Sequence, residues 1–188
     1  MVSTFYGIAI IVIIAITLFF LEIIQKEPIV LNENRNNQDT LNRLAYKVDS
    51  LVDHMHKYAY PSGEVSKRLY NRWKTIRNDS DGLKEISYRE NTAAYTISKS
   101  KIRICVKNKN NIYEDENTMM FVMLHELGHI MSESMHHTSE FKENFSLIVQ
   151  KAIEMNLYRY EAFSSYPKNF CGVDIKNSPV NERGLRNW

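Results

Sequence analysis

The pentapeptide at residues 125–129, with the sequence H-E-L-G-H, constrains the folding of this chain more than any other segment. It follows the uncharged and mostly apolar residues 118–124. In an α-helix, residues four positions apart lie on the same face, so a helix here would point the imidazoles of His125 and His129 the same way. Two such imidazoles can bind a metal ion such as Zn²⁺. The pentapeptide therefore predicts an apolar helix with a metal site on one face.

The residues on either side of the motif predict where this helix begins and ends. Residues 114–118, E-D-E-N-T, place acidic side chains and a capping residue at its start, where they complement the positive end of the helix dipole. Residues 132–134, S-E-S, give little reason for the helix to continue. The chain can therefore turn back toward the metal after the motif.

A third metal ligand is expected after this turn. A catalytic zinc ion usually has three protein ligands and one open position for water. His136 and His137 are the imidazole candidates, and both follow the motif closely. A carboxylate from the next helix, Glu143 or Glu154, is a more distant alternative.

The residue after the first imidazole indicates the chemistry. Glu126 is placed where a carboxylate can accept a proton from a water on the metal, and such a water can attack a peptide carbonyl. The motif thus predicts an enzyme, a zinc metallopeptidase, with Zn²⁺ as cofactor, Glu126 as general base and a protein or peptide as substrate. A hydrogen-bond donor could help zinc to stabilise the oxyanion, and three tyrosines are candidates by position alone: Tyr158, Tyr160 and Tyr166.

The N-terminal 21 residues contain no charged side chain. As a helix, about 20 residues at 1.5 Å each would span about 30 Å, the thickness of a bilayer's hydrocarbon core. No basic residue precedes the apolar run and no small-x-small cleavage site follows it, which argues against a cleaved signal peptide. Residues 1–25 are therefore predicted to be a transmembrane anchor. Because basic residues follow the segment, the domain after it is expected on the cytoplasmic side of a single-pass membrane protein.

The rest of the chain predicts one α+β domain at residues 39–175, after a polar, Asn-rich linker at residues 26–38. Apolar residues at helical spacing predict a helix from a cap at Asp39–Thr40 to about Tyr58, and a second helix that ends before the turn-rich residues 78–82.

Between residues 83 and 107, apolar residues alternate with polar ones and predict two or three strands, of which 102–107 is the clearest. Thr138 or Ser139 is expected to cap a helix after the motif. The chain beyond Leu157 is expected to be rich in loops, with residues 176–188 as a flexible tail.

Charge and cysteine content exclude two classes of function. The net charge is +2, so the chain lacks the strongly basic character of a nucleic-acid-binding protein, and no nucleic-acid partner is expected. Its two cysteines, Cys105 and Cys171, are far apart and have no C-x-x-C spacing, which excludes a zinc ribbon. Two free or buried thiols are the favoured interpretation, and a disulfide is the alternative. The sequence does not indicate an oligomeric state.

The motif and the residues after it resemble the SprT/WLM group of zinc metallopeptidases, and most closely the WLM-like metalloproteases of large DNA viruses. The pattern is H-E-x-x-H, a short insert of seven residues here, and then H-x-x-x-F at residues 137–141. The resemblance covers roughly residues 95–171 and implies a zincin-like α+β fold with a small sheet beside the motif helix. It implies that His125, His129 and His137 bind zinc and that Glu126 is the general base. His137 is favoured over His136 because only His137 keeps the H-x-x-x-F spacing.

Two other functions compete with a membrane-anchored zinc metallopeptidase. One is a catalytically inactive protein that binds zinc for structural or interaction purposes, which the intact set of four residues disfavours. The other is the digestion of proteins crosslinked to DNA, a task that the SprT/WLM resemblance implies. The nearly neutral charge and the predicted anchor disfavour this second alternative.

Overall fold

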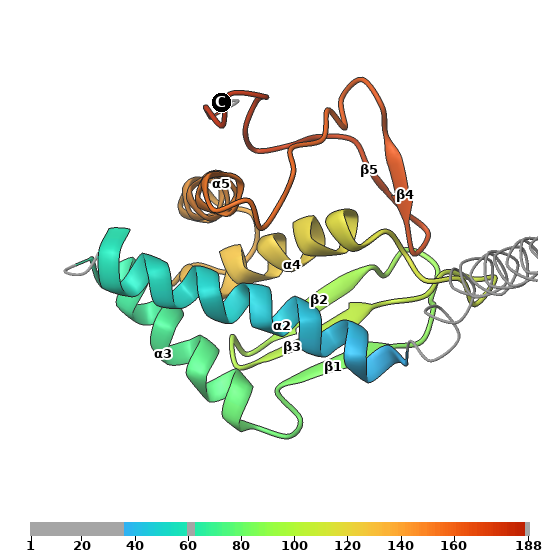
Figure 1. Ribbon diagram of the computed structural model, residues 1–188, viewed down its shortest axis with the longest axis horizontal. Coiled ribbons are helices and arrows are strands. Elements are labelled where there is room, and N and C mark those ends of the chain that lie inside the picture. The colour runs from blue at the N-terminus through green and yellow to red at the C-terminus, as the bar shows by residue number, and fades with distance from the viewer. Residues whose placement is uncertain (1–35, 60–62, 187–188) are drawn as a thin grey trace, which may run out of the picture. The chain divides into compact units, whose positions relative to one another are not determined.

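The computed structural model describes residues 36–59 and 63–186 (Figure 1). The described part of the chain is a mixed α+β structure with four α-helices, a three-stranded sheet and a two-stranded sheet. The prediction of an α+β domain is therefore confirmed.

Two helices form the N-terminal part of the described domain. Helix α2 (Asn37–His54) continues into the short π-helix η1 (Met55–Ala59), and α3 (Glu64–Asn78) follows. Helix α2 begins within the predicted linker, two residues before the expected cap at Asp39. Its apolar residues recur three or four positions apart and lie fully or almost fully in the core, as the sequence pattern predicts: Leu41, Leu44, Val48, Leu51 and Val52.

The three-stranded sheet follows a tight turn after α3. A Cβ at Gly82 would lie 1.9 Å from the carbonyl oxygen of Ile76, so only glycine fits this return of the chain. Strands β1 (Leu83–Ile86), β2 (Ala94–Ile97) and β3 (Lys101–Cys105) form a sheet in the order β1-β3-β2. β1 pairs with β3 in parallel and β2 pairs with β3 antiparallel, so β2 is an edge strand.

Helices α4 (Glu116–Met131) and α5 (Ser139–Glu154) pack on each other and form the centre of the domain. The predicted caps are present: a side-chain oxygen of Asp115 accepts from the backbone N–H of Thr118, and Thr138 accepts from that of Phe141. α4 also packs against α3 and β2, and most of its residues are buried. Because it has neighbours on several sides, α4 is apolar around most of its circumference and not only along one stripe.

The C-terminal region contains a hairpin that the sequence pattern did not indicate. Strands β4 (Lys168–Phe170) and β5 (Val173–Ile175) pair antiparallel through a two-residue turn. Both turn residues, Cys171 and Gly172, have positive φ, as a tight hairpin turn of this length requires. In the view of Figure 1, this hairpin lies above α4 and the three-stranded sheet lies below it.

Cys105 and Cys171 form a disulfide. The interpretation of two free thiols is therefore wrong. The bond joins the end of β3 to the turn of the hairpin across a sequence separation of 66 residues. The two cysteines meet only because the chain folds back over α4, and no local spacing could indicate this.

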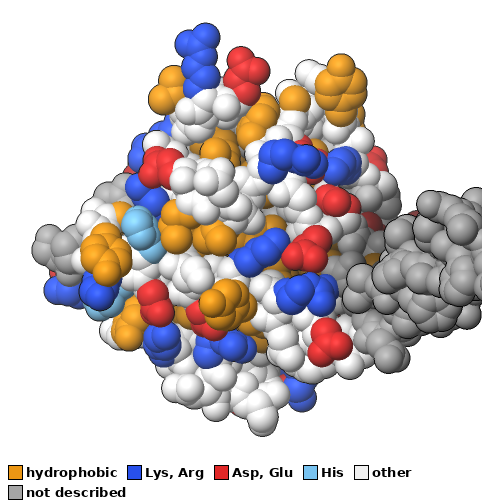
Figure 2. All heavy atoms as spheres, viewed as in Figure 1, with side chains coloured by type: hydrophobic (Ala, Val, Ile, Leu, Met, Phe, Trp, Pro, Cys, Tyr) orange, Lys and Arg blue, Asp and Glu red, His pale blue; other side chains and the backbone are white. Residues whose placement is uncertain are grey.

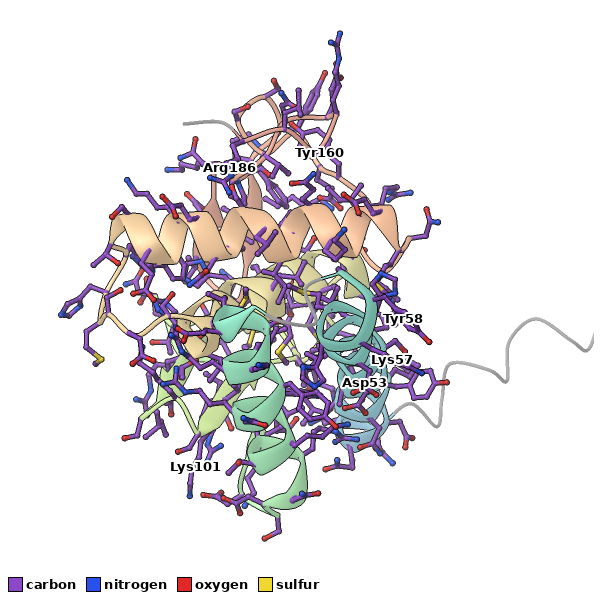
Figure 3. The ribbon with its side chains drawn as sticks, turned by 90° about the vertical axis from the view of Figure 1, so that its left-hand side faces the viewer. Asp53, Lys57, Tyr58, Lys101, Tyr160 and Arg186 are labelled. Carbon is purple, nitrogen blue, oxygen red and sulfur yellow. A yellow bond between two sulfur atoms is a disulfide. The ribbon has the colours of Figure 1, made fainter. Side chains whose placement is uncertain are left out.

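Part of the predicted flexible tail packs on the domain. Val180 is fully buried, and the hydroxyl of Ser146 in α5 donates to the carbonyl oxygen of Pro179 at 3.0 Å. Figure 3 shows α5 crossing the molecule, with Tyr160 and Arg186 on one side of it and Asp53, Lys57 and Tyr58 on the other.

The surface formed by α2 and α3 carries charges of both signs. Figure 2 shows basic and acidic side chains interspersed on this face. Several of them pair: Arg77 with Asp49 at 3.2 Å, and Lys47 with Glu116 at 2.9 Å. Exposed pairs of this kind contribute little to stability, and their mixture produces no extended field of one sign on this face.

The predicted localisation, a single-pass membrane protein with a cytoplasmic domain, requires correction. Within residues 36–59 and 63–186, no helix is both long and apolar enough to cross a membrane. α4 is apolar but has 16 residues, about 24 Å of helix against the ~30 Å of a bilayer core. α2 has 18 residues but is amphipathic, with charged side chains such as Arg43 and Lys47. The expected anchor, residues 1–25, lies outside the described residues.

Candidate metal centre

Three imidazoles converge at the C-terminal half of α4. His125 and His129 lie one helical turn apart on the same face, and His137 reaches them from the loop that joins α4 to α5. One nitrogen from each ring lies within 4.8 Å of the others, and the Nε2 atoms of His125 and His137 are 3.0 Å apart. A tetrahedral zinc ion with bonds of about 2 Å would separate its ligand nitrogens by about 3.3 Å. The three side chains could therefore hold a metal ion, and their nitrogen donors suit zinc.

The connecting loop, residues 132–138, is anchored to the end of α4. The hydroxyl of Ser132 donates to the carbonyl oxygen of Gly128 at 2.8 Å and accepts from the side-chain amide of Asn144 in α5 at 3.0 Å. The next two backbone N–H groups, of Glu133 and Ser134, donate to the carboxylate of Glu140 at 2.8 and 2.9 Å. The loop therefore has a defined shape before it reaches His137.

Glu140 is a strong acceptor for this loop. Its hydrogen bond from the backbone of Glu133 is the main cause that lowers its carboxyl pKa from 4.5 to about 2. The hydrogen bonds from Ser134 act in the same direction. The carboxylate is thus ionised over the whole neutral and mildly acidic range, which keeps the loop bound to the start of α5.

Three basic side chains donate to the carbonyl oxygens at the C-terminus of α4. The ammonium of Lys99 donates to Ser132 and Ser134 at 2.6 and 2.7 Å and to His129 at 3.3 Å. Two arginines of α3 do the same: Arg68 donates to Met131 at 2.7 Å, and Arg72 donates to Ile130 and Ser132 at 2.8 and 3.0 Å. These donors satisfy carbonyls that a helix end leaves free, and their charge complements the negative end of the helix dipole.

Lys99 reaches this position from a strained turn. Ser98 and Lys99 connect β2 to β3 with φ values of 47° and 55°, which non-glycine residues seldom adopt. Such a conformation costs of order 1 kcal/mol for each residue. Its result is a partly buried ammonium that contacts three carbonyls, and this burial lowers the pKa of Lys99 below its ordinary value.

The phenylalanines of α5 form the wall behind the imidazoles. The ring of Phe141 stacks on that of His129 with a centroid separation of 4.3 Å, and Phe145 contacts His125 edge-on at 5.1 Å. Gly128 permits this approach, because a Cβ there would lie 3.0 Å from Phe141 and 3.2 Å from Phe145. The phenylalanine four residues after His137 thus orients the ligands by direct packing.

Burial keeps two of the imidazoles in the form that binds metals. Loss of solvent, reinforced by the neighbouring imidazoles, lowers the pKa of His125 to about 3 and that of His129 to about 4. Both rings are therefore neutral at pH 7. His137 is exposed, so the group is open to solvent on that side.

Glu126 is held beside this group by the edge strand. Its side chain is 4% exposed, and Oε2 accepts a hydrogen bond from the hydroxyl of Thr96 in β2 at 2.7 Å. Burial raises the pKa of this carboxyl to about 7, and the hydrogen bond from Thr96 opposes the rise. No local pattern indicated a role for Thr96, because it lies 30 residues before Glu126.

Two cavities meet at His125 and Glu126. The first, of about 360 Å³, is lined by both residues, by β2 and its turn, and by the loop that carries His137. The second, of about 430 Å³, lies toward α5 and the β4–β5 hairpin. Cavities of about 300–1,000 Å³ are typical of ligand sites. The imidazole group thus borders an open cleft and is not enclosed within the core.

The structure distinguishes among the sequence candidates for the third ligand. It brings His137, and not His136, into the group of imidazoles, and His136 has a φ of 65° that turns the chain there. Glu143 is exposed, and Glu154 is exposed and pairs with Lys151. Neither carboxylate belongs to the group.

The tyrosine candidates for stabilising an oxyanion do not line either cavity. Tyr158 is 2% exposed and packs against Phe121, and burial raises its pKa. Tyr160 packs on the core and Tyr166 is exposed. The tyrosine that lines the first cavity is Tyr95 of β2, which lies within the segment 83–107 predicted to form strands.

Comparison with known proteins finds relatives in three viruses. The chain is 27% identical over 115 residues to an uncharacterized protein of Invertebrate iridescent virus 6. This match covers 60% of the present chain and 64% of the viral protein. It is 32% identical over 99 residues to an uncharacterized protein of Invertebrate iridescent virus 3, a match that covers 51% of this chain and 60% of that protein. It is 29% identical over 107 residues to an uncharacterized protein of Acanthamoeba polyphaga mimivirus, with 53% of this chain and 54% of that protein covered.

The chain thus spans less than two thirds of the length of these relatives. No protein-family model and no solved structure matches it.

Proposed function

We propose that this protein is a zinc-dependent metallopeptidase that hydrolyses peptide bonds. The observation that carries the proposal is the convergence of His125, His129 and His137 beside the buried carboxylate of Glu126, at the junction of two cavities. Three imidazoles with one open side are the ligand set of many catalytic zinc sites. The resemblance of residues 95–171 to SprT/WLM metallopeptidases, and with it a zincin-like fold, is part of the same proposal.

Glu126 and Thr96 have different roles in the proposed hydrolysis. When bound, zinc would act as a Lewis acid that polarises the scissile carbonyl and makes a coordinated water more acidic. Glu126 accepts a proton from the attacking water and passes it to the leaving amine. The hydrogen bond from Thr96 occupies Oε2, which orients the carboxylate and leaves Oε1 for the water.

The surroundings of the imidazoles maintain their geometry during this reaction. Phe141 and Phe145 limit the rotation of the rings by packing against them. Lys99 and Glu140 hold the loop that carries His137. Such supporting contacts around a metal site commonly change metal affinity or activity by about 10–100-fold.

The test measures zinc content and peptide hydrolysis with the full chain. The wild type should bind one zinc ion and cleave a library of mixed peptides. Glu126→Gln should keep zinc and lose hydrolysis by about 100-fold or more, because a general base typically contributes 10²–10⁴. Glu143→Gln on the exposed face of α5 is the matched control and should behave as the wild type.

Two results would contradict the proposal. If Glu126→Gln cleaves as fast as the wild type, Glu126 is not the base. If zinc binds but no peptide is cleaved, the metal is structural, as in a catalytically inactive zinc-binding protein. His137→Ala and His136→Ala complete the test, since only the first should lower zinc affinity.

A further inference from the structure

The second cavity, of about 430 Å³, has a lining unlike that of the first. Its walls come from four separate parts of the chain, namely β2, α4, α5 and the β4–β5 hairpin. Most of its lining side chains are apolar: Ala93, Ala94, Phe121, Val122, Phe145, Val173 and Ile175.

Most residues that line the first cavity, by contrast, have polar side chains. Its lining includes Thr96, Ser98, Lys99, Ser134 and His136. The two cavities share Ala94, His125 and Glu126, so they adjoin at the proposed reaction centre. A peptide that passes from one cavity to the other would therefore meet mostly polar residues on one side of the scissile bond and mostly apolar residues on the other.

The apolar cavity is preformed. Its wall in β5 belongs to a hairpin whose turn is covalently attached to the end of β3 by the Cys105–Cys171 disulfide. The wall in α4 is fixed by ring packing, because Phe121 contacts Phe145 at 5.4 Å and Phe163 at 4.8 Å. A ligand group that enters this space does not have to order it first, which favours binding.

We propose that this cavity is a specificity pocket that selects a bulky apolar side chain, such as Leu, Met or Phe, on the substrate residue next to the scissile bond. The inference rests on the proposed peptidase function and names the substrate class of the same site. Its basis is the apolar lining, a volume that accommodates one large side chain, and the direct continuity with Glu126. Burial of a large apolar side chain would favour such substrates by at least about 10-fold over glycine.

The experiment compares kcat/KM for peptides that differ only in the residue next to the scissile bond, which is Gly, Ala, Leu, Phe or Asp. The wild type should prefer Leu or Phe over Gly and Asp by at least about 10-fold. Ile175→Trp, which fills the cavity from β5, should lower the ratio of Leu to Ala substrates by about 10-fold. Ile112→Trp, at a residue 60% exposed that lines neither cavity, is the matched control and should keep the wild-type ratio.

A second variant keeps the test decisive if Ile175→Trp does not fold. Val173→Asp places a carboxylate in the same apolar wall, next to Lys176, and should lower the ratio of Leu to Ala substrates by about 10-fold. Peptide binding to Glu126→Gln is measured in parallel by fluorescence anisotropy, which does not require turnover.

The outcomes separate the pocket from the peptidase function. Cleavage without preference for Leu or Phe, or a preference that Ile175→Trp and Val173→Asp leave unchanged, overturns the pocket and leaves the peptidase intact. Tighter binding of Leu peptides without any cleavage supports the pocket and overturns the peptidase. Absence of both cleavage and selective binding overturns both.

Discussion

Single side chains outside the H-E-x-x-H motif determine how its residues are presented. Thr96 holds one oxygen of Glu126, and Lys99 holds the helix end from which the loop to His137 departs. Both belong to β2 or its turn, a segment whose alternating pattern indicated only a strand. Their roles follow from a single packing contact, that of the edge strand with α4.

Replacing Thr96 by Val should reduce kcat for peptide hydrolysis by about 10-fold, because one hydrogen bond to a charged or polar partner contributes about 1–2 kcal/mol. Valine keeps the volume and the branching of threonine, so zinc content should stay that of the wild type. Steady-state kinetics and metal analysis measure the two effects. Thr75→Val on α3 is the control, and an unchanged kcat in Thr96→Val would show that Glu126 is oriented without this bond.

Replacing Lys99 by Met should lower zinc affinity by about 10–100-fold, since it removes the donor that joins His129, Ser132 and Ser134. Lys99→Arg should restore part of the affinity, because it retains the charge at the helix end. Competition with a fluorescent chelator gives the affinities. Lys109→Met, at an exposed turn residue, should bind zinc normally, and equal affinity in Lys99→Met would refute a positioning role.

At the scale of elements, the loop between α4 and α5 is held by hydrogen bonds at the ends of both helices. The carbonyls at the end of α4 accept from Lys99, Arg68 and Arg72, and α5 presents the carboxylate of Glu140 in its first turn. Glu140 accepts from the loop backbone while Arg68 lies 3.4 Å from it. The seven-residue insert before His137 therefore has a fixed conformation and not merely a sufficient length.

The lowered pKa of Glu140 predicts how stability depends on pH. Its carboxyl pKa is about 2 in the folded protein against 4.5 ordinarily. The ionised group thus stabilises the fold above about pH 4.5, and this contribution is lost as pH falls toward 2. Thermal unfolding of metal-free protein should show the wild type more stable than Glu140→Gln at pH 6 and the difference vanishing near pH 2. A difference independent of pH would contradict this role, and Glu143→Gln provides the comparison.

At the scale of the whole domain, α4 is the element around which the other parts assemble. The sheet, α3 and α5 pack against it, and the C-terminal hairpin returns to the end of β3. The metal-binding face is therefore assembled from segments that are distant in sequence. The disulfide is the covalent link in this arrangement. It joins β3, which precedes α4 and α5 in the chain, to the β4–β5 hairpin, which follows them.

Removal of the disulfide by the double substitution Cys105→Ala and Cys171→Ala should lower the free energy of unfolding by about 4 kcal/mol, with 2–5 as the usual range. The estimate reflects the long loop of chain that the bond closes in the unfolded state. Urea denaturation with and without reductant measures it. The wild type should lose stability in reductant and the double variant should not; a wild type that is indifferent to reductant would contradict the bond's contribution.

Local patterns in the sequence determined the helices and the residues that could bind metal. Spacings of three and four residues place Leu41, Leu44 and Val48 in the core, and the caps Asp115 and Thr138 act on backbone groups three residues away. These interactions lie within one or two helical turns, so the sequence pattern contains all the information that they require. The anchor expected at residues 1–25 falls outside the described residues, and the membrane localisation drawn from it was not upheld.

Tertiary structure alone decided the contacts that complete the site. Thr96 meets Glu126 across 30 positions, and Cys105 meets Cys171 across 66. The apolar cavity is likewise assembled from four separate parts of the chain. Each of these contacts depends on the order of strands in the sheet and on how the chain crosses α4, which no short pattern of residues encodes. The motif thus determined which atoms could take part in the chemistry, and the packing around α4 decided which of them meet.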